Sequence, residues 1–280
     1  MEQNYYIKNI HSKFIEVKGR DSAEFLQGLI TNDIYKCNNS KNILYSCLLS
    51  PQGKFLADFF ISKPGNYFLI EIHEKYFETF CNKLNMYKLR SKIEINQNTK
   101  LISLIFFNKD ISQFSGSFNS FKDPRNNNLG IKIYINSKSS DLKIIDKVKE
   151  FNYDFYKEML IKNLIPNSAD DLIEKKSLLL ENNFQNINAI DWNKGCYVGQ
   201  EITARMKYRS LLKKQIYNLE LISGDLQIGE KIYLNEINIG EVISKINQYL
   251  LCMLKIDLVD KKKLNQENLE INSSIILKFL

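Results

Sequence analysis

The chain has 280 residues, of which 44% are hydrophobic and 12% aromatic, so it can bury a core of its own, and its length suits one large domain plus a small one. Its 39 basic and 32 acidic residues give a formal charge of +7, which favours anionic partners by long-range steering. The lysines are spread along the chain without a basic block among aromatic residues, and no apolar run has membrane-spanning length, so neither direct nucleic-acid binding nor membrane insertion is expected.

The first half of the chain alternates between helix and strand signals. A helix is predicted from Ser22, because Asp21-Ser22-Ala23-Glu24 has the spacing of a capping box and apolar residues follow at helical positions. Two apolar stretches, 44–49 and 54–62, enclose Ser50-Pro51-Gln52-Gly53 and predict a hairpin. The order that continues predicts an α+β domain: a strand at 67–72, a helix at 74–87, and strands at 93–95 and 101–107.

The second half changes character twice. A polar stretch covers 108–128, and residues 142–164 carry mainly helical signal. Beyond Arg209, short strand candidates alternate with Gly and Asn turns, as a small closed sheet requires. We therefore predict a domain of residues 1–210 followed by a β-barrel domain of residues 211–280.

Five cysteines, at positions 37, 47, 81, 196 and 252, are odd in number, widely spaced and form no CxxC pair. They indicate reduced thiols rather than a disulfide framework. The first residues show neither a basic region followed by an apolar core nor an Arg-rich amphipathic stretch. The expected location is therefore the cytoplasm, in a bacterium.

The most informative segment is Lys194-Gly195-Cys196-Tyr197-Val198-Gly199-Gln200-Glu201, which continues through Arg205 to Arg209. Its two glycines permit a tight turn or a close approach, and Lys194 is placed to lower the pKa of the Cys196 thiol. Glu201 starts a helix-compatible run, where a carboxylate complements the helix dipole. Cys196 is thus a candidate reactive or metal-ligating sulfur, although a single cysteine is more often a small buried hydrophobe.

The string KGCYVGQE followed by ARMKYR resembles the signature of the YgfZ family, which includes mitochondrial iron-sulfur assembly relatives. Other segments are similar to that family in order and spacing: Gly19-Arg20-Asp21, Phe25 to Gly28, Thr31-Asn32-Asp33, Ser50 to Lys54, Ala57-Asp58-Phe59, Tyr87 to Arg90, Asp123-Pro124-Arg125, and Asp191-Trp192.

The resemblance implies a fold like that of the glycine-cleavage T protein: a folate-binding domain of two mixed α/β halves, then a small β-barrel. It implies a tetrahydrofolate-binding accessory protein for assembly or repair of iron-sulfur proteins, including enzymes that thiolate tRNA. Assembly factors and their client enzymes would be the partners. Cys196 would be the functional thiol, with a rim formed by Lys194, Gly195, Tyr197, Gly199, Gln200, Glu201 and Arg205.

The same resemblance places tetrahydrofolate in a central channel with the signature loop at its mouth. The candidate contacts are Asn32, Asp33, Asp58, Arg125 and Tyr156. Each has a local alternative: Asn32 and Asp33 can end a helix, Arg125 can close a turn, and Tyr156 can belong to the core.

Some residues depart from the family pattern. Leu160 and Leu164 stand where the family usually has Arg and Gly, and Lys162 stands where T proteins have a glutamate. Ala57 replaces one of the paired aspartates of T proteins beside Asp58, so aminomethyl transfer lacks one carboxylate. A folate-dependent aminomethyltransferase or demethylase is therefore kept only as the alternative function.

A conventional enzyme is not expected from the remaining signals. The two histidines, His11 and His73, lie in segments with plain structural interpretations, and no P-loop or dinucleotide fingerprint is present. One thiol cannot hold an iron-sulfur cluster, which needs about four ligands. If Cys196 ligates a cluster, the other ligands come from a partner, a second copy of the chain, or small thiols such as glutathione. Direct RNA binding is a third hypothesis, without a stacking platform to support it.

Overall fold

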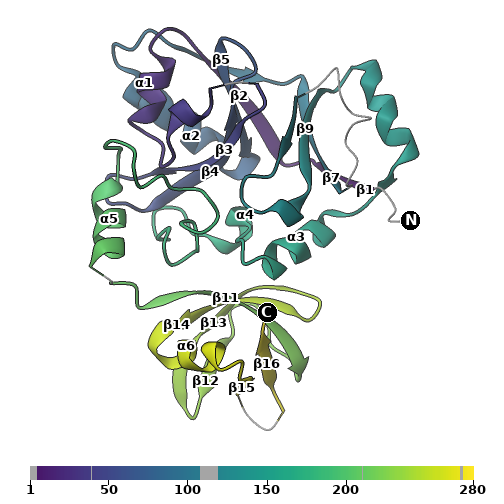
Figure 1. The fold of residues 1–280 in the computed structure, drawn as a ribbon, viewed down its shortest axis with the longest axis vertical. Helices are drawn as coiled ribbons and strands as arrows, with labels where there is room; N and C mark the ends of the chain where they lie inside the picture. Colours follow the sequence, from purple (N-terminus) through teal and green to yellow (C-terminus); the bar gives the residue numbers. More distant parts are fainter. Residues whose placement is uncertain (1–4, 39, 108–118, 210, 272–273) are drawn as a thin grey trace.

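The computed structural model describes residues 5–280 except 39, 108–118, 210 and 272–273, and gives only the backbone at 141, 144 and 147. The described chain forms three sheets (Figure 1). The first two share a continuous core, and the third lies beyond them as a separate C-terminal layer.

The central five-stranded sheet has the order β3-β4-β5-β2-β6 and is antiparallel throughout. Its strands are β2 (Ser12–Lys18), β3 (Ile43–Leu49), β4 (Phe55–Ser62), β5 (Tyr67–His73) and β6 (Glu94–Asn98). Helix α2 (Glu74–Lys88) buries Tyr76, Phe80 and Leu84 against this sheet. The predicted hairpin and helix are confirmed, whereas β2 was not predicted.

The second sheet has the order β10-β1-β7-β9-β8. It contains β1 (Tyr5–Asn9), β7 (Leu101–Phe107), β8 (Asn119–Lys122), β9 (Ile131–Asn136) and β10 (Lys149–Glu150). The predicted helical region at 142–164 is divided, because β10 pairs in parallel with β1 between the 3-10 helix η4 (Ser140–Lys147) and α3 (Tyr153–Lys162). Part of the predicted polar stretch, 108–118, lies outside the described residues.

Short helices and an irregular segment complete the large unit. They are α1 (Ser22–Gln27), the 3-10 helices η1 (Ile34–Lys36) and η3 (Asn127–Leu129), α4 (Ser168–Asp171) and α5 (Gln200–Tyr208). Between α4 and α5 the chain has no regular helix or strand, yet it buries Leu179, Leu180, Phe184 and Ala189. This segment therefore belongs to the core, and it delivers the signature loop to the start of α5.

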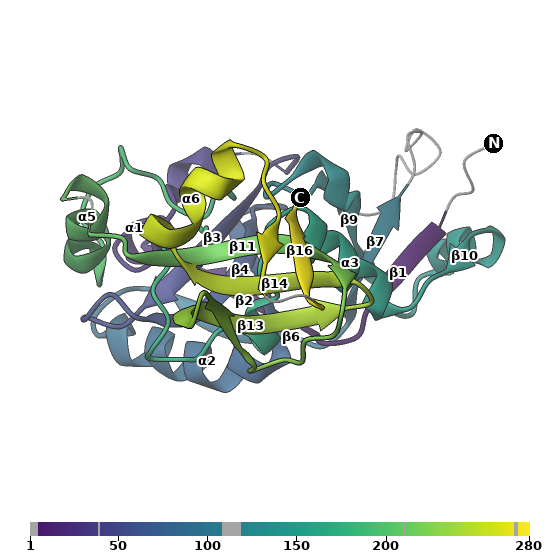
Figure 2. The ribbon, with the colours of Figure 1, turned by 90° about the horizontal axis from the view of Figure 1, so that it is seen from below.

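The C-terminal sheet has the order β12-β13-β14-β11-β16-β15 and is nearly closed into a barrel (Figure 2). Its strands are β11 (Lys214–Ser223), β12 (Lys231–Leu234), β13 (Ile237–Ile246), β14 (Tyr249–Lys255), β15 (Leu269–Glu270) and β16 (Ile276–Phe279). Helix α6 (Ile256–Leu264), which was not predicted, buries Val259 in the barrel core. The α+β fold with a small C-terminal barrel is thus confirmed.

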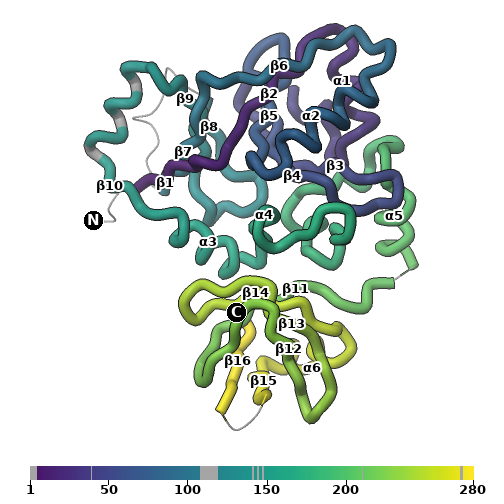
Figure 3. The backbone as a smooth tube through the Cα atoms, turned by 180° about the vertical axis from the view of Figure 1, so that it is seen from behind, coloured from purple at the N-terminus to yellow at the C-terminus, as the bar shows by residue number. Residues whose placement is uncertain are grey.

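The barrel packs on the large unit through its own cluster of apolar residues. Ile216, Leu251 and Met253 contact Ile161 of α3. The backbone amide of Ile216 donates to the carbonyl of Glu181, and the Asn218 side chain donates to the carbonyl of Lys162. Figure 3 shows the connection from α5 to β11 running along one side of this interface.

Candidate functional site

The signature loop is anchored by the buried side chain of Lys194. Its Nζ donates to the backbone carbonyls of Gln27 (2.8 Å), Ile30 (2.6 Å) and Asn32 (3.0 Å). Burial lowers the pKa of Lys194 to about 8, and the carboxylates of Asp33 and Asp191 oppose this shift. Lys194 therefore satisfies the last carbonyl of α1 and two carbonyls in the segment that follows the helix. Lys194 does not donate to the Cys196 thiol, although the sequence had suggested that Lys194 lowers the pKa of that thiol.

Two glycines let the loop approach the first hairpin closely. Gly199 has φ 83°, and a Cβ there would lie 2.4 Å from the carbonyl oxygen of Ser50. Gly53, in the turn between β3 and β4, has φ 69° and would meet Ile202 of α5 in the same way. Gly195 differs, because a Cβ there has nothing within 4 Å. The loop is thus fixed at both ends and open at its centre.

Cys196 lies at that open centre and is exposed, unlike the other four cysteines of the chain. Cys37, Cys47 and Cys252 are buried, and Cys81 is half-buried. Burial raises the pKa of Cys37 to about 12 and that of Cys81 to about 11, and it raises the pKa values of Cys47 and Cys252 as well. Burial thus favours the protonated form of these four thiols, and Cys196 is the most exposed of the five.

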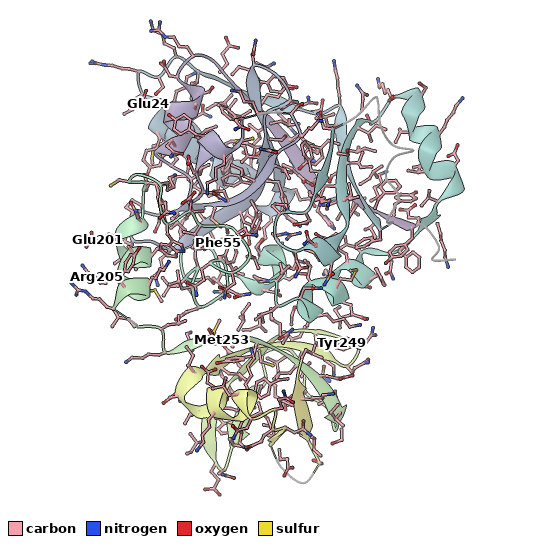
Figure 4. All side chains as sticks on the ribbon, in the orientation of Figure 1. Glu24, Phe55, Glu201, Arg205, Tyr249 and Met253 are labelled. Atoms are coloured by element: carbon pink, nitrogen blue, oxygen red, sulfur yellow. The ribbon has the colours of Figure 1, made fainter. Side chains whose placement is uncertain are left out.

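The remaining residues of the predicted rim have different environments. Tyr197 is buried, with its hydroxyl lacking a hydrogen-bond partner in the described structure. Gln200 accepts from the Tyr197 amide at 3.3 Å. Glu201 and Arg205 form an ion pair of 2.7 Å. Figure 4 shows both residues on the outer side of α5. The rim is therefore partly structural, and its exposed charged members pair with each other.

Asn32 and Asp33 serve the local structure around the loop. Asn32 donates to the carbonyls of Tyr45 (2.9 Å) and Asn188 (2.8 Å). Asp33 caps η1 by accepting from the Tyr35 amide at 3.1 Å and also accepts from Gln27. Asn32 lines a cavity of about 450 Å³ that Asp191, Trp192 and Asn193 border beside the signature loop.

A second, smaller cavity lies between the two sheets and brings together Asp58, Arg125 and Tyr156. Asp58 accepts from Tyr45 at 2.6 Å and from Ser168 of α4. Tyr45 also lines the cavity beside the signature loop, so its side chain lies between that cavity and the smaller one. Both oxygens of the one carboxylate in this part of the hairpin are thus engaged by neighbouring hydroxyls.

The guanidinium of Arg125 is buried and held through its Nε and Nη2 atoms. It forms two hydrogen bonds to Asp123, of 3.0 and 2.8 Å, and donates to the Tyr156 hydroxyl. Its charge also lies over the rings of Tyr45 (5.2 Å) and Phe60 (4.8 Å). Although burial favours the neutral form, Asp123 raises the pKa of Arg125, so this group stays charged at the cavity wall.

A buried ion pair closes the other side of the small cavity. Lys132 of β9 lies 2.9 Å from Glu71 of β5 and so links the two sheets. Glu71 also accepts from Ser12 (2.6 Å) and Tyr134 (2.7 Å). Burial opposes its ionisation, but Lys132 and the Ser12 hydroxyl hold the pKa of Glu71 below its usual value. The pair is thus a fixed part of the wall.

The small cavity is too small for tetrahydrofolate in the geometry described. Its volume is about 60 Å³, whereas ligand pockets for drug-sized molecules are about 300–1,000 Å³. Arg125, Asp58 and Tyr156 are paired with protein groups rather than left open to a pterin ring. The small cavity therefore does not hold the cofactor by itself, whereas the neighbouring cavity lined by Asn32 and Tyr45 has about 450 Å³.

The departures from the family pattern have physical counterparts here. Leu160 is buried and lines the small cavity, and Leu164 has φ 54°, a conformation that suits the glycine usual at that position. Lys162 pairs with Glu158 and lies 4.0 Å from the centre of the Tyr249 ring, so it faces the barrel. Ala57 is buried and lies beside Asp58 on β4, where side chains alternate between faces. A second carboxylate at position 57 would point away from Asp58.

Sequence reasoning missed Ser168, Glu71 and Lys132, which line the small cavity, and Tyr45, which donates to Asp58. A signal for Glu71 existed, because an acidic residue in the middle of an apolar strand must find a buried partner. Its partner on β9 had no sequence signal, since the pairing depends on how the two sheets meet. Within the described residues, no group of three or more His, Cys, Asp or Glu side chains is arranged to hold a metal.

Comparison of the fold with solved structures gives a close match over the whole chain. The aminomethyltransferase T of the glycine cleavage system from Bartonella henselae superposes with a TM-score of 0.78, covering 99% of this chain and 85% of that one, at 12% identity. The chain has the glycine-cleavage T-protein fold. At this identity the likeness concerns the fold alone, and no protein-family model matches the sequence.

Sequence relatives add information about the class of protein. The mitochondrial iron-sulfur cluster assembly factor IBA57 homolog of Neurospora crassa is 32% identical, covering 89% of this chain and 63% of that protein. The mouse mitochondrial IBA57 is 24% identical over 74% of this chain. The chain spans 63%, 54% and 55% of the length of three such relatives. The resemblance to iron-sulfur assembly proteins is thereby supported at this coarser level.

The same relatives correct one prediction. A bacterial cytoplasmic location was expected, but the named relatives are mitochondrial proteins of eukaryotes. The prediction was wrong because it rested on the first residues and on unpaired cysteines, and neither feature distinguishes the cytoplasm from a mitochondrion. As a separate finding, no helix among the described residues is both long and apolar enough to cross a membrane.

Proposed function

We propose that this chain belongs to the YgfZ/IBA57 family and is an assembly or repair factor for iron-sulfur proteins, with Cys196 as its functional thiol. The observation that carries the proposal is the contrast among the cysteines. Cys196 is exposed on a loop anchored by Lys194 and Gly199, while the other four thiols are buried or half-buried. The sequence relatives named for iron-sulfur cluster assembly support this role.

The proposed role is to present one ligand to a cluster that another molecule also holds. One thiolate supplies one of the roughly four ligands that an iron-sulfur cluster needs, so the cluster is cargo here. The anchored loop keeps Cys196 at a fixed place on the surface, which lowers the entropic cost of sharing a ligand. The partners would be proteins of the assembly machinery and client enzymes. The inclusion of tRNA-thiolating clients rests on the family resemblance alone.

A conventional folate-dependent transferase is not favoured as a second function. The carboxylate of Asp58 is engaged by Tyr45 and Ser168, and position 57 carries no second carboxylate. The small cavity is closed around these groups. The proposal therefore does not depend on tetrahydrofolate.

The test compares Cys196→Ser with Cys81→Ser in cells that lack the native chain. We expect Cys196→Ser to reduce the activity of cluster-dependent enzymes at least several-fold, with an unchanged melting temperature of the purified protein, because the side chain is exposed. Cys81→Ser is the matched control for loss of a thiol elsewhere. Normal cluster-enzyme activity with Cys196→Ser would remove the thiol from the mechanism.

A further inference from the structure

A large apolar groove runs along α5, from Ile202 in the first turn to the connection beyond the helix. Its volume is about 1000 Å³. One wall is α5, another is formed by residues 211–213 ahead of β11, and a third is the start of α6 on the barrel. Figures 1 and 3 show where α5, β11 and α6 lie. The groove thus lies where the large unit, the connection and the barrel meet, outside the site described above.

The floor of the groove is apolar and partly exposed. Ile202 and Met206 lie one turn apart on α5, and Leu178, Leu211 and Leu212 continue the surface. Leu211 is 48% exposed. Large apolar side chains gathered around one hollow are typical of a protein interaction site rather than of a solvated surface.

The walls of the groove are held by backbone hydrogen bonds. The Leu211 amide donates to the carbonyl of Met206, at 3.2 Å, and the Ile256 amide donates to the carbonyl of Lys213, at 3.0 Å. The first bond ties the connection to α5, and the second ties it to the barrel. The hollow is thus a formed surface that a partner can enter without first ordering it.

The rim of the groove is mainly basic. Three lysines line it, whereas the lining carboxylates are Glu181 and Asp257. Glu181 lies 3.7 Å from one of those lysines. The three lysines are Lys213, Lys214 and Lys255, so lysines exceed carboxylates in the rim by one.

We propose that this groove, here called the α5 groove, docks an amphipathic acidic segment of the protein with which Cys196 shares its cluster. An apolar floor with a basic rim complements a helix that presents apolar side chains flanked by Asp and Glu. The chain's own charge of +7 makes a second copy a poorer match for such a rim. This inference rests on the proposed function of Cys196 and identifies the kind of partner.

The distance between the groove and the thiol suits a single partner. Helix α5 has nine residues, so it is about 13 Å long. A specific interface buries about 800 Å² on each partner and therefore extends about 30 Å across. A protein seated in the α5 groove thus reaches past the helix to the loop that carries Cys196.

The test uses two labelled synthetic peptides and fluorescence anisotropy. Both peptides place Leu at the positions of one helical face; one carries Glu at the flanking positions and the other carries Lys. We expect the Glu peptide to bind the full chain at least ten-fold more tightly than the Lys peptide, with affinity falling as salt rises. Absence of binding, or equal binding of both peptides, would overturn the proposal.

Matched variants localise the binding. Leu211→Glu places a like charge in the floor and should weaken the Glu peptide at least ten-fold. Ile237→Glu is the control, because Ile237 is similarly exposed, at 53%, and lies on the barrel outside the groove. Equal losses in both variants, or no loss with Leu211→Glu, would contradict docking in the groove. A wild-type dimer in sedimentation that Leu211→Glu dissociates would assign the groove to a second copy instead.

Failure of this inference is separable from failure of the proposed function. Cys196→Ser should bind the Glu peptide as the wild type does, because Cys196 does not line the groove. Leu211→Glu should also reduce cluster-enzyme activity in cells, as Cys196→Ser should. If Cys196→Ser reduces cluster-enzyme activity but Leu211→Glu does not, the proposed role of the thiol stands and docking in the groove is refuted. If Cys196→Ser leaves cluster-enzyme activity normal but the Glu peptide still binds selectively, docking in the groove stands and the proposed role of the thiol is refuted.

Discussion

At the scale of single residues, the signature loop combines anchored and open positions. Lys194 donates to three backbone carbonyls, and Gly199 approaches Ser50 at a distance no side chain permits. Cys196 between them is exposed. The loop's motif thus serves two purposes: most of its residues build the loop, and the thiol is what the loop presents.

The two glycines of the loop should respond differently to the same substitution. Gly199→Ala adds a Cβ that would lie 2.4 Å from the Ser50 oxygen, at φ 83°. We expect it to lower the free energy of unfolding by about 2–3 kcal/mol, because backbone must move and the conformation is strained. Gly195→Ala, with nothing within 4 Å, should change it by less than about 0.5 kcal/mol. Urea unfolding measures both, and equal losses would contradict the proposed close packing.

At the scale of elements, helix α2 begins on a titratable cap. The Nδ1 atom of His73 accepts from the Lys75 amide at 3.1 Å, so the neutral ring carries its proton on Nε2. The ring also stacks with His11 at 5.3 Å. Burial and the neighbouring His11 lower the pKa of His73, and the carboxylates of Asp58, Glu74 and Asp170 oppose this.

This cap predicts a loss of stability in mild acid. The folded state binds a proton on His73 more weakly than the unfolded state does. The contribution of neutral His73 to the free energy of unfolding is therefore fully present above about pH 6.5, and it is lost as the pH drops through the pKa of the folded state. His73→Asn keeps a cap without a titrating group. We expect the wild type to lose more free energy of unfolding than the variant as the pH falls from about 7.5 to about 5, a range that spans the ordinary pKa of histidine. Parallel urea-unfolding curves over this range would show that the cap does not titrate.

At the scale of the whole molecule, two sheets meet around a polar network instead of an open channel. Glu71 and Lys132 pair across the junction, and Arg125 binds both Asp123 and Tyr156. A fold shared with the glycine-cleavage T protein therefore contains a cavity of about 60 Å³ at this place. Likeness of fold does not carry a binding site with it.

The closed network predicts weak or absent binding of tetrahydrofolate. By calorimetry, we expect the wild type to show no dissociation constant below about 100 µM, because binding must first separate Arg125 from its partners. Tyr156→Ala removes a ring from the cavity wall and should bind more tightly than the wild type. Saturable wild-type binding in the micromolar range would show instead that the network opens readily.

The sequence by itself determined the local features of this protein. Apolar spacing and turn residues predicted α1, α2 and the first hairpin, and the short strands after Arg209 predicted the barrel. The capping box predicted at Asp21 is not formed, because the Asp21 carboxylate accepts from the Lys92 amide instead. These elements were predictable because their signals lie within a few neighbouring residues. The resemblance at 194–201 also directed attention to Cys196, which the structure places on the surface.

Only the tertiary structure decided the roles that depend on distant partners. It brought Lys194 to carbonyls more than 160 residues away and placed Lys132 against Glu71. It also closed the cavity around Arg125 and assembled the α5 groove from the large unit, the connection and the barrel. A buried charge must be neutralised by whatever group the fold brings near it, and that choice has no local signal in the chain.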